Sequence, residues 1–288
     1  MADTNSTDFG PLVDAAWLAE NHDRPDVLTI DATWYLPIDS KDARAEYRAA
    51  HVPGAVFVDI SDLRDTDHAA PHMLPTPEGF AAAMGALGIG NDCRVVVYDK
   101  GDYAATRVWW MLRVFGHDAV AVLDGGLASW HETGGAMESG DAATAASEFT
   151  SRFRPFLVRT MDQMRTNLET GRETVVDARP PARFAGDLPE MRQGVESGHI
   201  PGSINLHYDG LMDNASGRFR SAREIEGIFE DAGVALDPAI VATCGSGVSA
   251  CHIALGLYLT GRREIPVYDG SWAEWGADPT NPRRLGPD

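Results

Sequence analysis

A chain of 288 residues is long enough to form two domains of ordinary size, each with its own hydrophobic core. Its 43 Asp and Glu against 24 Lys and Arg give a formal net charge of −19, which argues against nucleic acid or an anionic membrane surface as a partner. Three cysteines are too few for a disulfide framework, so we expect a reducing, cytoplasmic compartment.

The chain begins with a polar, acidic stretch. Residues 1–10 lack the basic and apolar regions of a signal peptide, and no later apolar run is long enough to span a membrane. The rest of the first half shows alternating helical and strand patterns. We expect helices over 12–20, 42–50, 77–87 and 104–115, and strands over 27–31, 51–58 (after an initial turn), 95–98 and 120–123. This alternation predicts an α/β fold, a parallel sheet flanked by helices on both faces.

The second half repeats the pattern of the first. The repeat is visible in three pairs of segments: 95–98 and 240–243, Asp124-Gly125 and Asp269-Gly270, and HVPGAV at 51–56 and GHIPGS at 198–203. Members of the first two pairs are each 145 residues apart. An interval shared by several motifs indicates a duplicated domain. We therefore expect an N-terminal domain over 1–139, a linker over 140–152 and a C-terminal domain over 153–288.

One cysteine lies in a loop suited to holding an anion. The segment 243–251, TCGSGVSAC, follows an apolar run at 239–242 and precedes an apolar helical segment at 252–259. A strand, a glycine-bearing loop and a helix start are therefore expected. Converging N–H groups in such a loop and the positive end of the helix dipole favour a thiolate. Cys244 is thus a candidate nucleophile, and the alternative is a buried apolar cysteine.

The repeat also distinguishes the two halves chemically. The 145-residue interval places Asp99 at the position equivalent to Cys244. A carboxylate cannot perform thiolate chemistry, so we expect the N-terminal domain to be catalytically silent and the C-terminal domain to be active. The remaining cysteines, Cys93 before a strand and Cys251 on the following helix, are expected to be structural.

Motifs along nearly the whole chain resemble those of one enzyme family. HVPGAVFVDI and HMLP in the first half, with RFAGDLPEMR, GHIPGS, CGSGVSAC and DGSWAEW in the second, are similar to the tandem-domain rhodanese-like sulfurtransferases, most of all to 3-mercaptopyruvate sulfurtransferases. The resemblance implies two tandem rhodanese-like α/β domains with the active site in the second. It implies that Cys244 takes sulfur from a small-molecule donor as a persulfide, without a metal or organic cofactor. The acceptor would be cyanide or a thiol such as thioredoxin.

The resemblance also assigns donor-binding residues. Arg183 and Arg192 match two arginines that bind the carboxylate and keto oxygen of 3-mercaptopyruvate, a pairing that suits the guanidinium fork. Members that prefer thiosulfate carry basic residues directly after the cysteine, where this chain has the neutral Gly245 and Ser246. The loop residues expected to bind the persulfide and the donor are Gly245, Gly247, Val248 and Ser249.

A proton relay beside the loop is implied as well. Ser246, His72 and Asp59 match the relay of the 3-mercaptopyruvate enzymes, and desulfuration leaves a pyruvate enolate that must be protonated. The plainer alternative is that Asp59 ends a strand and His72 packs a loop. Arg179 is expected to be a surface residue and a structural partner of Asp177.

Three other functions are to be weighed. Thiosulfate:cyanide sulfurtransferase activity would use the same thiol with an inorganic donor. Cysteine-dependent phosphatases share the strand, loop and helix, but they need an arginine six residues after the cysteine, where this chain has Ala250. A non-catalytic persulfide carrier would use the thiol only to hold sulfur for a partner protein.

Overall fold

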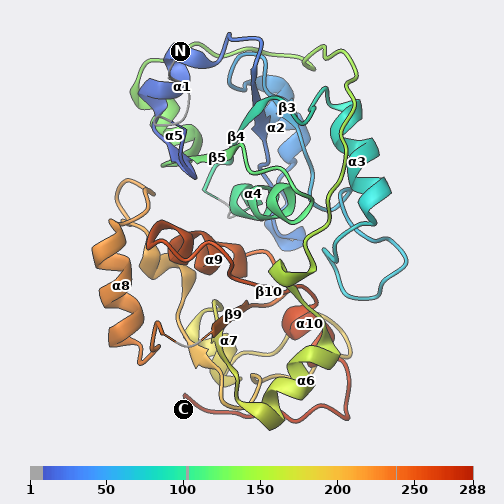
Figure 1. The fold of residues 1–288 in the computed structure, drawn as a ribbon, viewed down its shortest axis with the longest axis vertical. Helices are drawn as coiled ribbons and strands as arrows, with labels where there is room; N and C mark the ends of the chain where they lie inside the picture. Colours follow the sequence, from blue (N-terminus) through green and yellow to red (C-terminus); the bar gives the residue numbers. More distant parts are fainter. Residues whose placement is uncertain (1–8, 102–103, 238, 288) are drawn as a thin grey trace, which may run out of the picture. The chain divides into compact units, whose positions relative to one another are not determined.

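The computed structural model describes residues 9–101, 104–237 and 239–287, which form two compact units. The first unit contains the described chain up to Leu63, together with Pro75–Phe153 and Ala215–Arg218. The second contains Arg64–Leu74, Arg154–Asn214 and the described chain from Phe219 onward. Each unit therefore includes one short segment from the other half of the sequence, and each has its own sheet and helices (Figure 1).

The first unit contains a five-stranded sheet whose neighbouring strands are all parallel. In spatial order the strands are β1 (Leu12–Val13), β5 (Val120–Leu123), β4 (Arg94–Tyr98), β2 (Val27–Asp31) and β3 (Val56–Phe57). The helices are α1 (Ala15–Asn21), α2 (Ala43–Ala49), α3 (Pro77–Ala86), α4 (Ala104–Val114), α5 (Gly126–Glu132) and the short 3₁₀ helix η1 (Pro37–Asp39). The ranges of β2, β4, β5, α2, α3 and α4 match the predictions closely, whereas β3 covers only two residues of the predicted 51–58, and β1, α5 and η1 were not predicted.

The second unit has a sheet of the same design, again with parallel neighbours throughout. Its strands, in spatial order, are β6 (Val158–Arg159), β10 (Val267–Tyr268), β9 (Ala239–Thr243), β7 (Glu173–Asp177) and β8 (Ile204–Asn205). Its helices are α6 (Met161–Thr170), α7 (Pro181–Ala185), α8 (Ala222–Asp231), α9 (Ala250–Leu259), α10 (Ser271–Trp275), η2 (Pro155–Leu157) and η3 (Tyr208–Leu211).

The two sheets repeat one topology. In each sheet the first strand of the unit lies at one edge and the last strand lies next to it. The fourth, second and third strands then follow in that order to the other edge. Strands β4 and β9 are equivalent, and both of their bounds differ by 145 residues (239 − 94 and 243 − 98). The predicted fold class, two α/β domains with parallel sheets, is confirmed.

In the first unit, alternate residues of the central strands face opposite helical layers. Val96 and Tyr98 of β4 join a buried cluster with Leu18 of α1 and Trp130 of α5. Val95 and Val97, which alternate with them along β4, are buried as well. Helix α4 lies against β4 and β5 and is buried along its length. With both faces covered, these strands are continuous apolar runs rather than alternating ones.

The first helix is shorter than the sequence predicts. Leu12 and Val13 pair with β5 in the sheet instead of forming a first helical turn. The helix starts at Ala15 because the Asp14 carboxylate accepts a hydrogen bond from the N–H of Trp17 at 2.7 Å and so caps it. An apolar pair before a capping residue suits an edge strand as well as a helix, and the partner strand decides between them.

The segment Arg64–Leu74 belongs to the second unit although it precedes α3 in the chain. The N–H of Leu74 donates to the Asp269 carboxylate at 2.7 Å, just after β10. His68 Nε2 lies 3.5 Å from the carboxylate of Glu274 on α10. These contacts place His72, which lies between the two, in the second unit.

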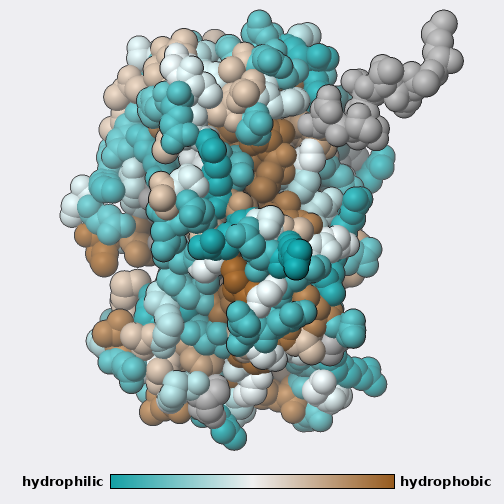
Figure 2. Space-filling model, turned by 90° about the vertical axis from the view of Figure 1, so that its left-hand side faces the viewer, coloured by the Kyte–Doolittle hydropathy of each residue, from teal (hydrophilic) through white to brown (hydrophobic). Residues whose placement is uncertain are grey.

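Much of the molecular surface is polar (Figure 2). The face drawn in Figure 2 is covered largely by hydrophilic residues, with apolar side chains scattered among them. Among the described residues, no helix is both long enough and apolar enough to cross a membrane.

Candidate active site

The Cys244 loop joins the carboxyl end of β9 to the start of α9. The N–H of Cys244 donates to the Ser271 hydroxyl at 3.1 Å, and the N–H of Trp272 donates to the Cys244 carbonyl at 2.9 Å. Ser271 has φ of 50°, a conformation that non-glycine residues adopt only where surrounding contacts impose it. These contacts fix Cys244 at the carboxyl edge of the sheet, where it is only 1% exposed.

The rest of the loop presents backbone donors. Gly247 has φ of 77°, which glycine adopts without steric cost. Among the described residues, no backbone carbonyl accepts from the N–H groups of Gly245, Ser246, Val248 or Ser249. Buried backbone donors almost always have a partner, and both Ser246 and Val248 are buried. Together with the N-terminus of α9, these donors make the loop a site for a negative charge.

The equivalent loop of the first unit carries its own negative charge. The Asp99 carboxylate follows β4 and accepts hydrogen bonds from the N–H groups of Gly101 and Ala105, both at 2.8 Å. Its backbone is held as that of Cys244 is, because the N–H of Leu127, 145 residues before Trp272, donates to the Asp99 carbonyl at 2.8 Å. In this loop a carboxylate already supplies the anion at the start of α4.

A buried ion pair lies beside the Cys244 loop. Arg179 Nε and Nη2 donate to the Asp177 carboxylate at 3.0 and 2.7 Å. The pairing predicted for these two residues is confirmed, but the predicted surface position is wrong, because the Arg179 side chain is 2% exposed and its guanidinium stacks over Trp272. Burial alone would lower the pKa of Arg179, but Asp177, Glu190 and Cys244 raise it above its usual value.

Two further arginines lie in the segment after α7. Arg183 Nη2 donates to Glu190 Oε2, and Arg179 Nη1 donates to Glu190 Oε1 at 3.4 Å. Burial and the Arg183 charge lower the pKa of Arg192, whereas Glu190 and Cys244 act in the opposite direction. The structure therefore brings both predicted donor-binding arginines into one electrostatic cluster, and it brings Arg192 within range of the Cys244 charge.

The remaining predicted residues fall in both units. His72 is 6% exposed, has φ of 58° and lies in the second unit with Ser246. Asp59 belongs to the first unit, where its carboxylate accepts from the N–H of Ser61 at 2.7 Å. Ser249 precedes α9 without capping it through its side chain. The relay of Ser246, His72 and Asp59 stays a prediction.

Sequence reasoning missed two charged groups of this site. Glu190 lies between Arg183 and Arg192 within RFAGDLPEMR, yet no role was predicted for it, and Arg179 was expected at the surface. The sequence signal for a buried ion cluster was a glutamate placed between two arginines in this segment. Among the described residues, no group of His, Cys, Asp and Glu side chains is arranged to hold a metal ion.

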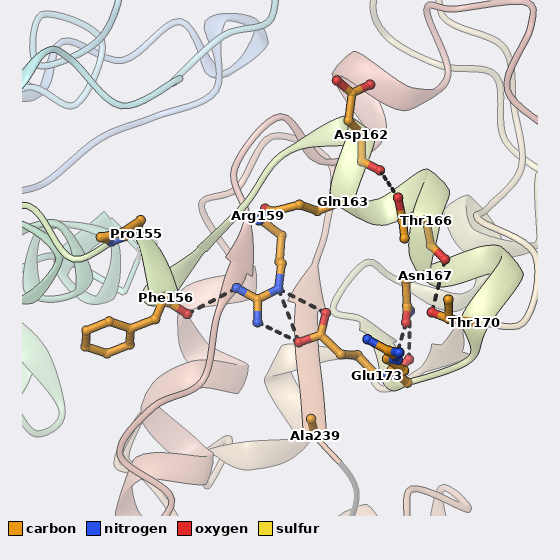
Figure 3. Close-up of a pocket in the computed structure, with 11 residues that line it drawn as sticks. Pro155, Phe156, Arg159, Asp162, Gln163, Thr166, Asn167, Thr170, Glu173 and Ala239 are labelled. Atoms are coloured by element: carbon orange, nitrogen blue, oxygen red, sulfur yellow. Dashed lines mark hydrogen bonds and ion pairs between the residues drawn. The ribbon is translucent and has the colours of Figure 1, made fainter.

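A separate pocket of about 710 Å³ opens at the other end of the second sheet (Figure 3). It is lined by the first residues of β7 and β9, Glu173 and Ala239, and by one side of α6. Arg159 Nη2 donates to Glu173 at 2.6 Å across it. The length of β9, about 16 Å by strand rise, separates this pocket from Cys244, so it takes no part in the thiol site.

Comparison with known proteins identifies the family. Residues 14–133 and 160–278 each match the model of the rhodanese-like domain. The chain belongs to the rhodanese-like family. It is 45% identical to the human 3-mercaptopyruvate sulfurtransferase, with 92% of this chain and 91% of that protein aligned. The identity to the Arabidopsis thaliana mitochondrial thiosulfate/3-mercaptopyruvate sulfurtransferase 1 is 44%, over 94% of this chain and 77% of that protein.

A solved structure extends the likeness to three dimensions. The rhodanese-fold 3-mercaptopyruvate sulfotransferase SseA from Escherichia coli superposes with a TM-score of 0.84 at 38% identity. The match covers 91% of this chain and 98% of SseA. The predicted resemblance to tandem-domain rhodanese-like sulfurtransferases is confirmed.

Proposed function

We propose that this rhodanese-like protein moves sulfur from 3-mercaptopyruvate to a thiol or cyanide acceptor through a persulfide on Cys244, and releases pyruvate. The observation that carries the proposal is the Cys244 loop, whose N–H groups form an anion site within electrostatic range of Arg179 and Arg192. The relatives named for 3-mercaptopyruvate align over more than nine-tenths of this chain.

The chemistry divides between the thiol and the arginines. The Cys244 thiolate attacks the donor sulfur, the carbon–sulfur bond breaks, and its electron pair stays on carbon as pyruvate enolate. Arg183 and Arg192 bind the donor carboxylate and keto oxygen and stabilise the enolate charge. The enolate takes one proton to become pyruvate, and we assign its delivery to the predicted relay of Ser246, His72 and Asp59. An acceptor thiolate then attacks the outer sulfur and regenerates Cys244.

The loop is assigned the role of holding the charged sulfur. The N–H groups of Gly245, Gly247 and Val248 and the Ser249 hydroxyl would donate to the persulfide, which is negatively charged when deprotonated. Ala250 provides no guanidinium for a phosphoryl group, which weighs against phosphatase chemistry. No metal or organic cofactor takes part in the proposed steps.

We also propose that the two domains differ in catalytic role. Residues 1–139 would form the catalytically silent domain, with Asp99 in place of the thiol, residues 140–152 the linker and residues 153–288 the catalytic domain. The location proposed is the cytoplasm and the acceptor a reduced thiol such as thioredoxin. All three cysteines are free, which is compatible with a reducing compartment.

The main alternative is thiosulfate:cyanide sulfurtransferase activity. The Arabidopsis relative is named for both donors, so family membership does not choose between them. The neutral Gly245 and Ser246 favour the keto acid, since a dianion gains more from basic neighbours. Relative turnover of the two donors by the purified protein separates the alternatives, and a clear preference for thiosulfate would refute our choice.

Mass spectrometry of the intact protein tests the persulfide. After treatment with 3-mercaptopyruvate we expect a gain of one sulfur atom in the wild type and in Cys251→Ala, and no gain in Cys244→Ala. Sulfur retained without Cys244 would overturn the mechanism. Multiple-turnover release of pyruvate with a small thiol acceptor would dismiss the non-catalytic carrier.

A further inference from the structure

Glu190 is a buried carboxylate in the middle of the arginine cluster. Its side chain is 3% exposed and accepts hydrogen bonds from both Arg179 and Arg183. It also raises the pKa of Arg192, which burial and Arg183 lower. One carboxylate thus acts on all three guanidinium groups of the site.

The contacts of Glu190 leave part of Arg183 available to a ligand. Glu190 engages Nη2 of Arg183. In the described part of the chain, Arg183 Nε is buried without a hydrogen-bond acceptor. A buried guanidinium donor without a partner is costly, and a donor carboxylate would satisfy it. Glu190 therefore holds the Arg183 side chain in place without filling its whole hydrogen-bonding capacity.

The charges of this cluster nearly cancel. Arg179, Arg183 and Arg192 contribute three positive charges, and Asp177 and Glu190 contribute two negative ones, so the cluster carries a net charge of +1. Without Glu190 the net charge would be +2. A charge of +1 balances a monocarboxylate, whereas a charge of +2 would balance a dianion such as thiosulfate.

We propose that Glu190 is a specificity-determining residue that restricts the donor site to monoanionic keto acids by lowering its positive charge. The inference rests on the proposed function, because it concerns the donor bound at that site. The repulsion between Glu190 and a bound dianion is twice that with a monoanion in the same place. Glu190 therefore weakens thiosulfate binding more than it weakens binding of a monocarboxylate, even though it holds Arg183 for both.

The test measures binding without turnover. In a Cys244→Ala background, calorimetry at low ionic strength gives the dissociation constants of thiosulfate and pyruvate. Their ratio cancels any loss of Arg183 positioning that affects both ligands equally. We expect Glu190→Gln to shift this ratio about fivefold in favour of thiosulfate, the order of magnitude left after solvent screening of one charge pair.

Three further variants complete the design. Glu190→Asp keeps the charge and should keep the wild-type ratio. Asp187→Asn removes a carboxylate that lies exposed in the same segment, and it should leave the ratio unchanged because solvent screens this charge. Glu190→Ala removes the same charge without adding an amide, so it must shift the ratio as Glu190→Gln does.

The possible results separate the two proposals. A ratio that is unchanged, or that moves toward pyruvate, in folded Glu190→Gln or Glu190→Ala overturns the role of Glu190. Failure of the wild-type enzyme to release pyruvate from 3-mercaptopyruvate refutes the proposed function instead. The binding ratio does not depend on that reaction, so the two failures are distinguishable.

Discussion

Replacing Arg183 by lysine tests whether the guanidinium fork, rather than its charge alone, binds the donor. Lysine keeps the positive charge but loses the planar set of donors that includes the buried Nε. A hydrogen bond to a charged group contributes about 1.5–3 kcal/mol. Loss of one such bond in the transition state lowers kcat/KM for 3-mercaptopyruvate about tenfold to a hundredfold.

Steady-state pyruvate release with a small thiol acceptor measures this effect. The matched control is Arg172→Lys, because Arg172 is an exposed arginine that lines the pocket at the opposite end of the same sheet. The control should keep wild-type kcat/KM. A value for Arg183→Lys within twofold of the wild type would show that Arg183 makes no directional bond to the donor, and the proposed binding mode would then be wrong.

Two further predictions concern stability. Gly247→Ala should lower the free energy of unfolding by about 1–2 kcal/mol, because alanine is strained at φ of 77°. Gly245→Ala is its control in urea titrations, since the added methyl group meets only Arg179 Cδ, at 4.0 Å, and equal losses in both would contradict the backbone argument. Burial lowers the pKa of His252 from 6.5 to about 3, so between these pH values the unfolded chain binds a proton that the folded chain excludes. Stability should therefore fall as the pH drops below about 6.5, by up to about 1.4 kcal/mol per unit, and less steeply in His252→Gln. Urea titrations at pH 7 and 5 give the loss of unfolding free energy between these pH values. An equal loss in the wild type and in His252→Gln would rule out His252 as the cause.

Much of the fold could be predicted because its signals are local. Apolar runs at 95–98 and 239–242 indicate buried parallel strands, and the interval of 145 residues between matching motifs reveals the duplication. The first helix was misjudged because Leu12 and Val13 satisfy either pattern until their partner strand is known. The inclusion of Arg64–Leu74 in the second unit depends on contacts with Asp269 and Glu274, about two hundred residues away in the sequence.

The candidate site shows the same contrast between local and distant signals. Cys244 was found because a strand, a glycine loop and a helix follow one another directly. The surface position predicted for Arg179 is wrong because burial of a guanidinium depends on acceptors outside its own motif, here Glu190 and the carbonyl of Gly198, 11 and 19 residues further along the chain. Charged residues are almost never fully buried unless they are paired, so their burial cannot be read from hydrophobicity.

The Asp99 and Cys244 loops share one backbone design but differ in the group that supplies the negative charge. The loop needs a negative group for its N–H donors, and in the first unit the Asp99 carboxylate meets this need by accepting from Gly101 and Ala105. In the second unit, under the proposed function, the group that completes the loop must also be consumed and restored in every reaction cycle. Under the proposed function, the first loop keeps a carboxylate at the position where its counterpart would alternate between thiolate and persulfide.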